Sequence, residues 1–555
     1  MTPRRSRSHY FIAAGVALSG VLFLTFSPRG PTLKSASVNQ SAREPIAALH
    51  ETRPDSSATE PRFDLSESGI DTVERAHFRE NLARALVRSD ARKNEAVLTF
   101  ASADAYRRFL ARAQHEGLSV LGQADALLSV RVRYDTLDSL ETDLRANPAD
   151  FSAVGANSLF HIPQKPAVEA RAAINEVPFL NSTLAFLGVP TDHAAWGQGV
   201  RIAVLDSGVS ADPTFSGSRV QYLDVGLGTL PGHGPEDGHG SAVASLAAGS
   251  STDAAGVASS ATVLSIRVTD TNGVGDLFTV AQAIIAAVDA GAPIINLSLG
   301  GYSTAPALNA AIDYATAHGA VLVAAAGNDQ AAQLTWPAAD PRVISVGAVD
   351  ARSQQVTFSN SGPQLQIVAP GYRVQTAWLD GQRVYVDGTS ASAPLVAGAI
   401  AAVMSQNPAL SAQQAWSIVR ATTSDAGVPG VDPSYGAGVL NLDWAMNYQN
   451  PTRLDPAIAS HFYDSAHGEM DFVIQNRSAQ IVRALALDVD ANGATQRFSL
   501  PEIAAGSSYV LKVPVTVKNA TANELRFTTQ LVTPVGFLDA NPANNRLTSR
   551  LVVGP

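Results

Sequence analysis

The sequence predicts an α/β domain in which helices cover both faces of a parallel sheet, preceded by a smaller α+β domain and followed by an all-β domain. Three observations carry this prediction. Near-continuous apolar segments alternate with helical segments across residues 179–450, which is typical of a buried parallel sheet. Shorter, mixed segments precede this region, and apolar and polar residues alternate with a period of two after about residue 450.

The first residues predict a secretory signal. Arg4, Arg5 and Arg7 precede an apolar stretch over residues 10–26, and a basic start followed by such a stretch is typical of a signal peptide. Residues 1–27 are therefore expected to direct secretion, outside the cell or into its envelope. Because the stretch is almost long enough to span a bilayer, an uncleaved membrane anchor is the alternative. Residues 28–72 show no apolar periodicity and are expected to be a linker.

Residues 73–162 are expected to form one small domain. After a helix over 73–87, the pattern reads as strand (95–100), helix (103–117), two strands within 118–134, helix (135–148) and a strand ending near Phe160. The order β-α-β-β-α-β is that of a ferredoxin-like domain. Residues 163–178 then form a second expected linker.

The central region, 179–450, contains four apolar strands separated by helices. The strands lie within 201–206, 262–270, 294–301 and 320–328, and the helices between them lie within 241–249, 279–291 and 306–319. Functional residues of such folds lie just beyond the carboxyl ends of the strands.

Residues 451–555 are expected to form a β-sandwich. Period-two stretches over 471–476, 484–490, 507–517 and 545–553 are separated by Asn, Gly and Pro. The sequence leaves open whether this domain binds a cell surface, binds substrate or is removed.

Composition excludes several functions. The chain is 46% hydrophobic and 16% charged, which is typical of a globular protein. It has no cysteine, so a thiolate nucleophile, a disulfide framework and a zinc-thiolate site are excluded. Its formal net charge of -10 argues against nucleic-acid binding.

Three short motifs carry the chemistry. Asp206 ends a buried strand, His239 lies between two glycines at the start of a helix, and Ser390 lies in the stretch VDGTSASAP before a long apolar helix. Pro394 is tolerated only near the start of that helix, so the helix begins close to Ser390, where unpaired amides can bind an anion. Ser392 falls inside the first turn and is expected to be structural.

Each motif also has a structural explanation when taken alone. Asp206 could be a turn residue, His239 a loop residue, and Ser390 a helix N-cap. His233 lies six residues before His239, but the carboxylate spacing of a metal site is missing. The three structural explanations become hard to maintain together, because Asp, His and Ser occur in the chain order of one class of Ser-His-Asp enzymes.

The motifs VLDSG, DGHGSAVAS and GTSASAP resemble those of subtilisin-like serine proteases, the subtilase or peptidase S8 family, over about residues 176–448. This resemblance implies a subtilisin-like fold, in which Asp206 orients His239, His239 acts as general base and acid, and Ser390 attacks the peptide carbonyl. Asn328 matches the asparagine that donates to the oxyanion in this family. No cofactor is required for this chemistry.

The resemblance also implies the substrate contacts. An extended peptide would bind by strand addition between two edges and above an apolar pocket. The matching residues are Ser298, Leu299 and Gly300 on one edge, Gly273 and Gly275 on the other, and Thr335 near the pocket floor.

The other domains acquire roles from the same resemblance. The ferredoxin-like domain is similar to the inhibitory and chaperone prodomain of secreted subtilases, whose tail, here about Leu159 to Pro178, would lie through the active site and be cleaved autocatalytically. The protein is thus expected to be a monomeric, autoprocessed endopeptidase acting on polypeptides.

Ala391 and Ser241 depart from the usual Met and Thr of the family, but neither residue takes part in the chemistry. Calcium often stabilises the family, yet DTNGVGD lacks the terminal Glu of an EF-hand, so a calcium site stays unplaced.

The motifs disfavour two other functions. A catalytically silent binding or adhesion protein on the same scaffold is disfavoured because Asp206, His239, Ser390 and Asn328 are all intact. An esterase of the α/β-hydrolase kind would have G-x-S-x-G and the order Ser, Asp, His, and the chain has neither.

Overall fold

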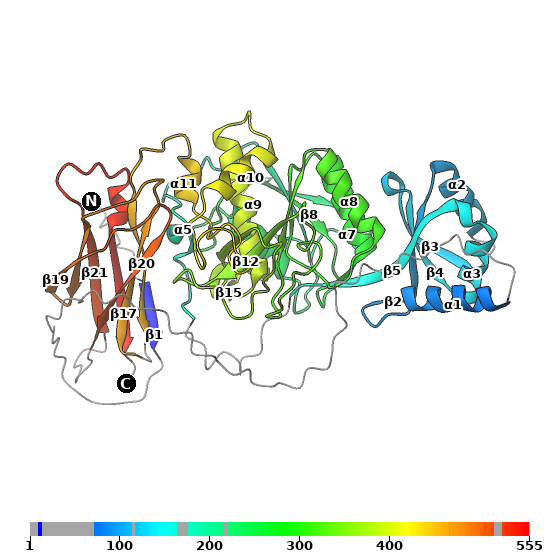
Figure 1. The fold of residues 1–555 in the computed structure, drawn as a ribbon, viewed down its shortest axis with the longest axis horizontal. Helices are drawn as coiled ribbons and strands as arrows, with labels where there is room; N and C mark the ends of the chain where they lie inside the picture. Colours follow the sequence, from blue (N-terminus) through cyan, green and yellow to red (C-terminus); the bar gives the residue numbers. More distant parts are fainter. Residues whose placement is uncertain are drawn as a thin grey trace.

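The computed structural model describes residues 9–13, 72–113, 117–163, 176–215, 219–464, 467–515 and 524–553. They form three bodies in a row, with a small α+β domain at one end, the α/β domain in the centre and a β domain at the other end (Figure 1). None of the helices within these ranges combines the length and apolar character needed to cross a bilayer. The predicted signal peptide and first linker lie outside the described residues, except for strand β1 (His9–Ala13), which runs parallel to β22.

The N-terminal domain is a four-stranded antiparallel sheet covered by helices. Its four strands lie in the order β3-β4-β2-β5, β9 (Val274–Asp276) of the central domain extends this sheet beside β5, and the chain follows the predicted β-α-β-β-α-β sequence after helix α1. The elements are α1 (Thr72–Leu86), β2 (Ala91–Phe100), α2 (Ala103–Arg112), β3 (Leu118–Ala124), β4 (Ser129–Tyr134), α3 (Leu137–Ala146) and β5 (Phe151–His161). Phe100, Phe109 and Phe151 pack against each other in its core. β5 extends out of this domain and reaches the central one (Figure 1).

The central domain is built on a parallel sheet of seven strands in the order β13-β12-β11-β10-β6-β8-β7. All six neighbouring pairs are parallel. The strands are β6 (Arg201–Asp206), β7 (Val220–Leu223), β8 (Thr262–Arg267), β10 (Ile294–Leu297), β11 (Val321–Ala325), β12 (Ile344–Val349) and β13 (Ile367–Pro370). The inner strands are buried on both faces, which explains why their sequences are almost continuously apolar.

Helices cover both faces of this sheet. They are α6 (His239–Ala248), α7 (Leu277–Asp289), α8 (Pro306–Ala317), α9 (Thr389–Gln406) and α10 (Ala412–Ala421), with the short α5 (Thr183–Phe186) and α11 (Leu442–Met446). Two small strands form a hairpin, β14 (Val374–Ala377) and β15 (Arg383–Val386), and β9 (Val274–Asp276) pairs with β5 of the N-terminal domain. The α/β fold class predicted from the sequence is confirmed.

The C-terminal region forms two sheets around one core. The strands are β16 (Pro456–Asp464), β17 (Glu469–Asn476), β18 (Ala486–Ala491), β19 (Ala494–Ser499), β20 (Ser508–Pro514), β21 (Glu524–Val532) and β22 (Arg546–Val553). β16, β17 and β20 form one sheet, and the other strands join β1 in the second. Their inner faces share a buried cluster that includes Phe472, Leu487 and Phe527.

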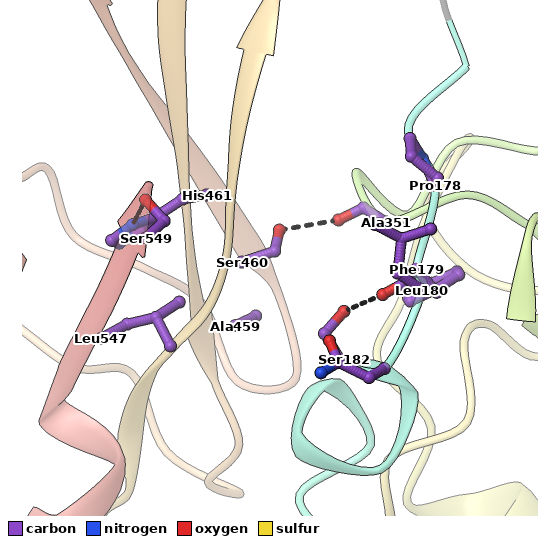
Figure 2. Close-up of a pocket in the computed structure, with 11 residues that line it drawn as sticks. Pro178, Phe179, Leu180, Ser182, Ala351, Ala459, Ser460, His461, Leu547 and Ser549 are labelled. Carbon is purple, nitrogen blue, oxygen red and sulfur yellow. Dashed lines mark hydrogen bonds between the residues drawn. The ribbon is translucent and has the colours of Figure 1, made fainter. Parts of the chain in front are cut away.

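The C-terminal domain contacts the central domain closely. Ser460 Oγ donates to the carbonyl of Ala351 at 3.1 Å, beside a small pocket between the two domains (Figure 2). Arg352 of the central domain lies 3.0 Å from Asp471 and stacks over the ring of Phe462. From the C-terminal side, Arg477 donates to the carbonyls of Ala185 and Phe186. The C-terminal domain is thus packed against the segment with which the central domain begins.

Candidate active site

Asp206 and His239 meet at the carboxyl edge of the sheet. Asp206 is the last residue of β6 and His239 the first of α6, and His239 Nδ1 donates to Asp206 Oδ1 at 2.8 Å. The backbone N–H of Ser207 donates to the same oxygen, and the carboxylate is fully buried. A carboxylate accepts only, so the contact places the proton on Nδ1 and leaves Nε2 as the acceptor of neutral His239.

The environment of His239 makes it a stronger base. Burial by itself lowers the pKa of His239, but the charge of Asp206 and its hydrogen bond, together with the charge of Glu236, raise this pKa above its ordinary value. A raised pKa favours taking up a proton, which is the task of a general base.

Ser390 is the second residue of α9, and a glycine makes room beside it. Gly388 precedes the helix with a φ of 141°, a conformation that favours glycine. A Cβ on Gly388 would lie 3.0 Å from Ser390 Oγ and 2.8 Å from Asn328 Nδ2. The hydroxyl of Ser390 and the side-chain amide of Asn328 therefore lie next to the same space beside Gly388. The N-cap position belongs to Gly388, so the interpretation of Ser390 as a mere N-cap is wrong.

Pro394 frees the carbonyl of Ser390. In a helix this carbonyl would accept from the residue four positions on, but proline has no backbone N–H. Ser298 Oγ donates to the carbonyl instead, at 3.0 Å, and Asn296 Nδ2 donates to Ser298 Oγ. The Ser298 side chain is thus buried and holds the start of α9, while the substrate contact predicted for the edge that contains residue 298 stays a prediction. Among the described residues no hydrogen bond joins His239 Nε2 to Ser390 Oγ, a contact that is often long in an enzyme without substrate.

Asn328 presents an unused donor at this point. It follows β11, and its Oδ1 accepts from both the backbone N–H and the hydroxyl of Thr389, each at 2.9 Å. Those two bonds fix the amide orientation, and the opposite atom, Nδ2, is buried with no hydrogen-bond partner. Buried donors are normally satisfied, so an unpaired one beside the predicted nucleophile is suited to a charge that develops during reaction. This role of Thr389 was not predicted, although the residue lies within the GTS motif.

Two backbone edges lie near Ser390, and residues 159–162 of the same chain lie between them. On one side β5 pairs with β9, with Phe160 opposite Gly275, and the N–H of Ile162 donates to the carbonyl of Gly273 at 2.9 Å. On the other side His161 and Gly300 exchange two backbone hydrogen bonds, each of 2.9 Å. The edges predicted to bind an extended peptide thus hold residues 159–162.

The remaining predicted pocket residues lie close to Gly300. A Cβ on Gly300 would lie 2.5 Å from Thr335 Oγ1, and Thr335 Oγ1 donates to the carbonyls of Ala325 and Ala326. Leu299 is fully buried in the main core, so its side chain supports the edge from behind.

Both carboxylates of the segment considered for calcium already have partners within the chain. Asp270 accepts from the N–H groups of Asn272 and Val274, and Asp276 caps α7 through Thr279. The described residues contain no group of three or more acidic or histidine side chains placed to hold a metal ion. Calcium binding, at this stretch or elsewhere, stays a prediction.

Comparisons with known proteins point to one family. The model of the Subtilase family matches residues 197–438. The chain is 33% identical to a thermostable alkaline protease of Halalkalibacterium halodurans, over 50% of this chain and 77% of that protein. It is 34% identical to Subtilisin Savinase of Lederbergia lenta, over 45% of this chain and 91% of that protein.

A solved structure extends the likeness in fold. Fervidolysin from Fervidobacterium pennivorans, described as a keratinolytic enzyme related to subtilisin, aligns with a TM-score of 0.55 over 85% of this chain and 78% of its own. At 19% identity this match concerns the fold alone.

Proposed function

The chain belongs to the subtilase family of serine peptidases, and from this premise we propose that it is a secreted, autoprocessed endopeptidase whose catalytic residues are Asp206, His239 and Ser390. The observation that carries the assignment is the buried contact between Asp206 and His239 at the sheet edge, together with the unpaired Asn328 amide beside Ser390.

The chemistry follows from the positions of these groups. Ser390 Oγ attacks the peptide carbonyl while His239 Nε2 takes its proton, and Asp206 stabilises the imidazolium that forms. The carbonyl oxygen becomes negative and accepts from Asn328 Nδ2. His239 then passes the proton to the leaving amine, and water releases the acyl group by the reverse steps.

Polypeptide substrates bind in the same way as residues 159–162. Backbone pairing with both Gly300 and Gly273 is independent of side chains, so this mode accepts many sequences. Leu299, Gly275 and Thr335 support the edges and the pocket beside them. We expect a roomy, mostly apolar pocket for the residue before the cleaved bond.

The N-terminal domain acts as an intramolecular inhibitor. In addition to residues 159–162, it contacts α7: Asn157 Oδ1 accepts from the N–H of Phe278, and Arg131 lies 3.2 Å from Asp276. Continuing the antiparallel register by two residues from the His161–Gly300 pair places Pro163 opposite Ser298, whose hydroxyl donates to the backbone carbonyl of Ser390. Processing should therefore occur at or soon after Pro163, within the linker 163–178.

The test compares the full-length protein with Ser390→Ala. We expect the unaltered protein to cleave casein, to react with a fluorophosphonate probe and to yield a mature chain whose N-terminus, read by sequencing, lies between residues 163 and 178. The variant should do none of these and remain unprocessed. Equal casein cleavage by both proteins would refute the proposal, and a folded parent chain without cleavage or labelling would favour a silent binding protein. Gel filtration of the mature chain tests the expected monomer.

A further inference from the structure

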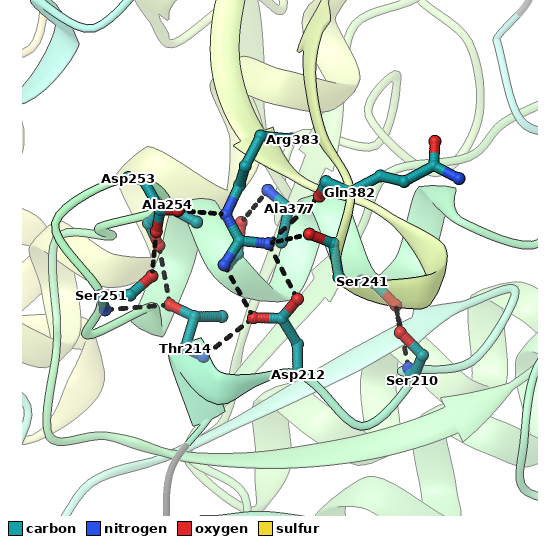
Figure 3. A network of polar contacts seen from close by, with 12 residues as sticks. Ser210, Asp212, Thr214, Ser241, Ser251, Asp253, Ala254, Ala377, Gln382 and Arg383 are labelled. Carbon is teal, nitrogen blue, oxygen red and sulfur yellow. Dashed lines mark hydrogen bonds and ion pairs between the residues drawn. The ribbon is translucent and has the colours of Figure 1, made fainter.

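The loop after Asp206 and the hairpin before Ser390 are joined by a buried charge pair. Asp212 Oδ2 accepts from Arg383 Nη1 at 2.9 Å, and Asp212 Oδ1 accepts from Arg383 Nη2 at 3.2 Å (Figure 3). The Asp212 side chain is fully buried and that of Arg383 is 19% exposed. A two-pronged contact of this kind fixes the orientation of two segments as well as their distance.

Both ends of this pair are close to catalytic residues along the chain. Asp212 lies on the loop that leaves β6 after Asp206. Arg383 begins β15, which runs through Gly388 directly into α9 and Ser390. Because β15 is short and leads straight to the helix, a shift of the hairpin would be passed on to the nucleophile.

The same hairpin is attached to the helix that begins with His239. In β14, Thr376 Oγ1 donates to the carbonyl of Ala242 at 2.8 Å, and the N–H of Ala377 donates to Ser245 Oγ at 3.1 Å. At the hairpin turn the indole of Trp378 lies directly on Gly238, where a Cβ would come within 2.1 Å of the ring. The hairpin therefore also sets the position of the first turn of α6.

A third contact joins the loop after Asp206 to helix α6. The N–H and the hydroxyl of Ser210 both lie 2.9 Å from Ser241 Oγ, two residues after His239 (Figure 3). The three segments that carry Asp206, His239 and Ser390 are thus joined to one another in pairs by polar contacts. Of these contacts, the Asp212–Arg383 contact between the Asp206 and Ser390 segments is an ion pair.

Further groups hold the charge pair in place. The backbone N–H of Thr214 donates to Asp212 Oδ1 at 2.8 Å, and Arg383 Nε lies 3.1 Å from Asp253 Oδ2. Asp253 in turn accepts from Ser251 Oγ (Figure 3). The guanidinium therefore lies between two carboxylates from different loops, which a flexible lysine could not bridge with the same geometry.

We propose that Arg383 and Asp212 are positioning residues, which hold the Ser390 end of the hairpin at a set distance from the Asp206–His239 pair. The proposal rests on the proposed function, because this distance matters to activity only if Ser390 is the nucleophile. Displacing a reacting group by about 1 Å costs on the order of 100-fold in rate, so a loosened hairpin should lower turnover rather than substrate binding.

The test measures kcat and KM on a peptide p-nitroanilide, the rate of fluorophosphonate labelling, and Tm. For Arg383→Gln we expect kcat and labelling to fall about 10- to 100-fold with KM within about twofold. Arg383→Lys should recover part of the loss, because it keeps the charge without the fork. Low millimolar guanidinium should raise the kcat of Arg383→Ala and leave the unaltered protein unchanged.

Arg342→Gln is the matched control. Arg342 makes a similar two-pronged contact with buried Asp340, but just before β12, at the opposite end of the sheet. Its loss should lower Tm about as much as Arg383→Gln and leave kcat intact. Should Arg383→Gln not fold, Arg383→Lys carries the same comparison.

The outcomes distinguish a failure of the positioning role from a failure of the proposed function. Unchanged kcat in folded Arg383→Gln, or an equal loss of kcat in Arg342→Gln, would overturn the positioning role while leaving the peptidase intact. An unaltered protein that neither cleaves nor reacts with the probe would instead overturn the proposed function, and the positioning role with it.

Discussion

Replacing Asn328 by alanine tests the most specific feature of the site. The change removes Nδ2, a buried donor without a partner in the resting enzyme. A donor that gains its partner only as the oxyanion forms stabilises the transition state and not the bound substrate. We therefore expect kcat to fall on the order of 100- to 1,000-fold with little change in KM. That magnitude is taken from the equivalent asparagine of subtilisin, a member of this family, and does not come from the structure.

The stability cost of the same change can be worked from the contacts. Asn328 Oδ1 accepts from the N–H and the hydroxyl of Thr389, and each such bond contributes about 0.5–1.5 kcal/mol. Asn328→Ala should therefore lose about 1–3 kcal/mol of stability, seen as a lower Tm.

Steady-state kinetics on a peptide p-nitroanilide and calorimetry separate the two effects. Thr389→Val is the control: it removes the hydroxyl that donates to Asn328 Oδ1 and accepts from the N–H of Gly327, but it keeps the Asn328 donor, so its kcat should fall much less. The reasoning fails if Asn328→Ala stays folded and keeps kcat within about threefold of the parent, or if KM alone rises.

Three further outcomes are expected. In Asp206→Asn the group that raises the pKa of His239 is gone, so the acidic limb of the kcat/KM profile should move to lower pH while kcat falls, which a pH series of initial rates would show. Burial raises the pKa of Asp350 to about 6, so the folded state favours its protonated form; relative to Asp350→Asn, the parent should lose stability as pH rises from about 4 through 6, measured as Tm at each pH. Arg352→Met leaves buried Asp471 without its closest cation and should cost about 3 kcal/mol or more, lowering Tm without changing kcat.

Much of the central fold could be predicted because its signals are local. Buried parallel strands are continuously apolar, and a strand such as Arg201–Asp206 keeps that pattern whatever lies beside it. The spacing of Asp206, His239 and Ser390 was equally readable, since each lies at the end of a strand or the start of a helix. Their catalytic roles stay predictions until the variants are assayed.

Contacts between segments far apart in the sequence could not be predicted from such local patterns. The hydroxyl of Ser298 donates to the carbonyl of Ser390 that Pro394 leaves free, a pairing across 92 positions. No periodicity reports such a contact, because it depends on how β10 and α9 pack.

The sequence by itself determined the class of fold, the family and the order of the reacting groups, since these depend on apolar periodicity and short motifs. Only the tertiary structure decided which residues of the predicted tail pair with the Gly273 and Gly300 edges, that Thr389 orients Asn328, and that Arg383 joins Asp212. The physical reason is that hydrogen bonds and ion pairs act over about 3 Å, and which groups come that close is set by the packing of the whole chain.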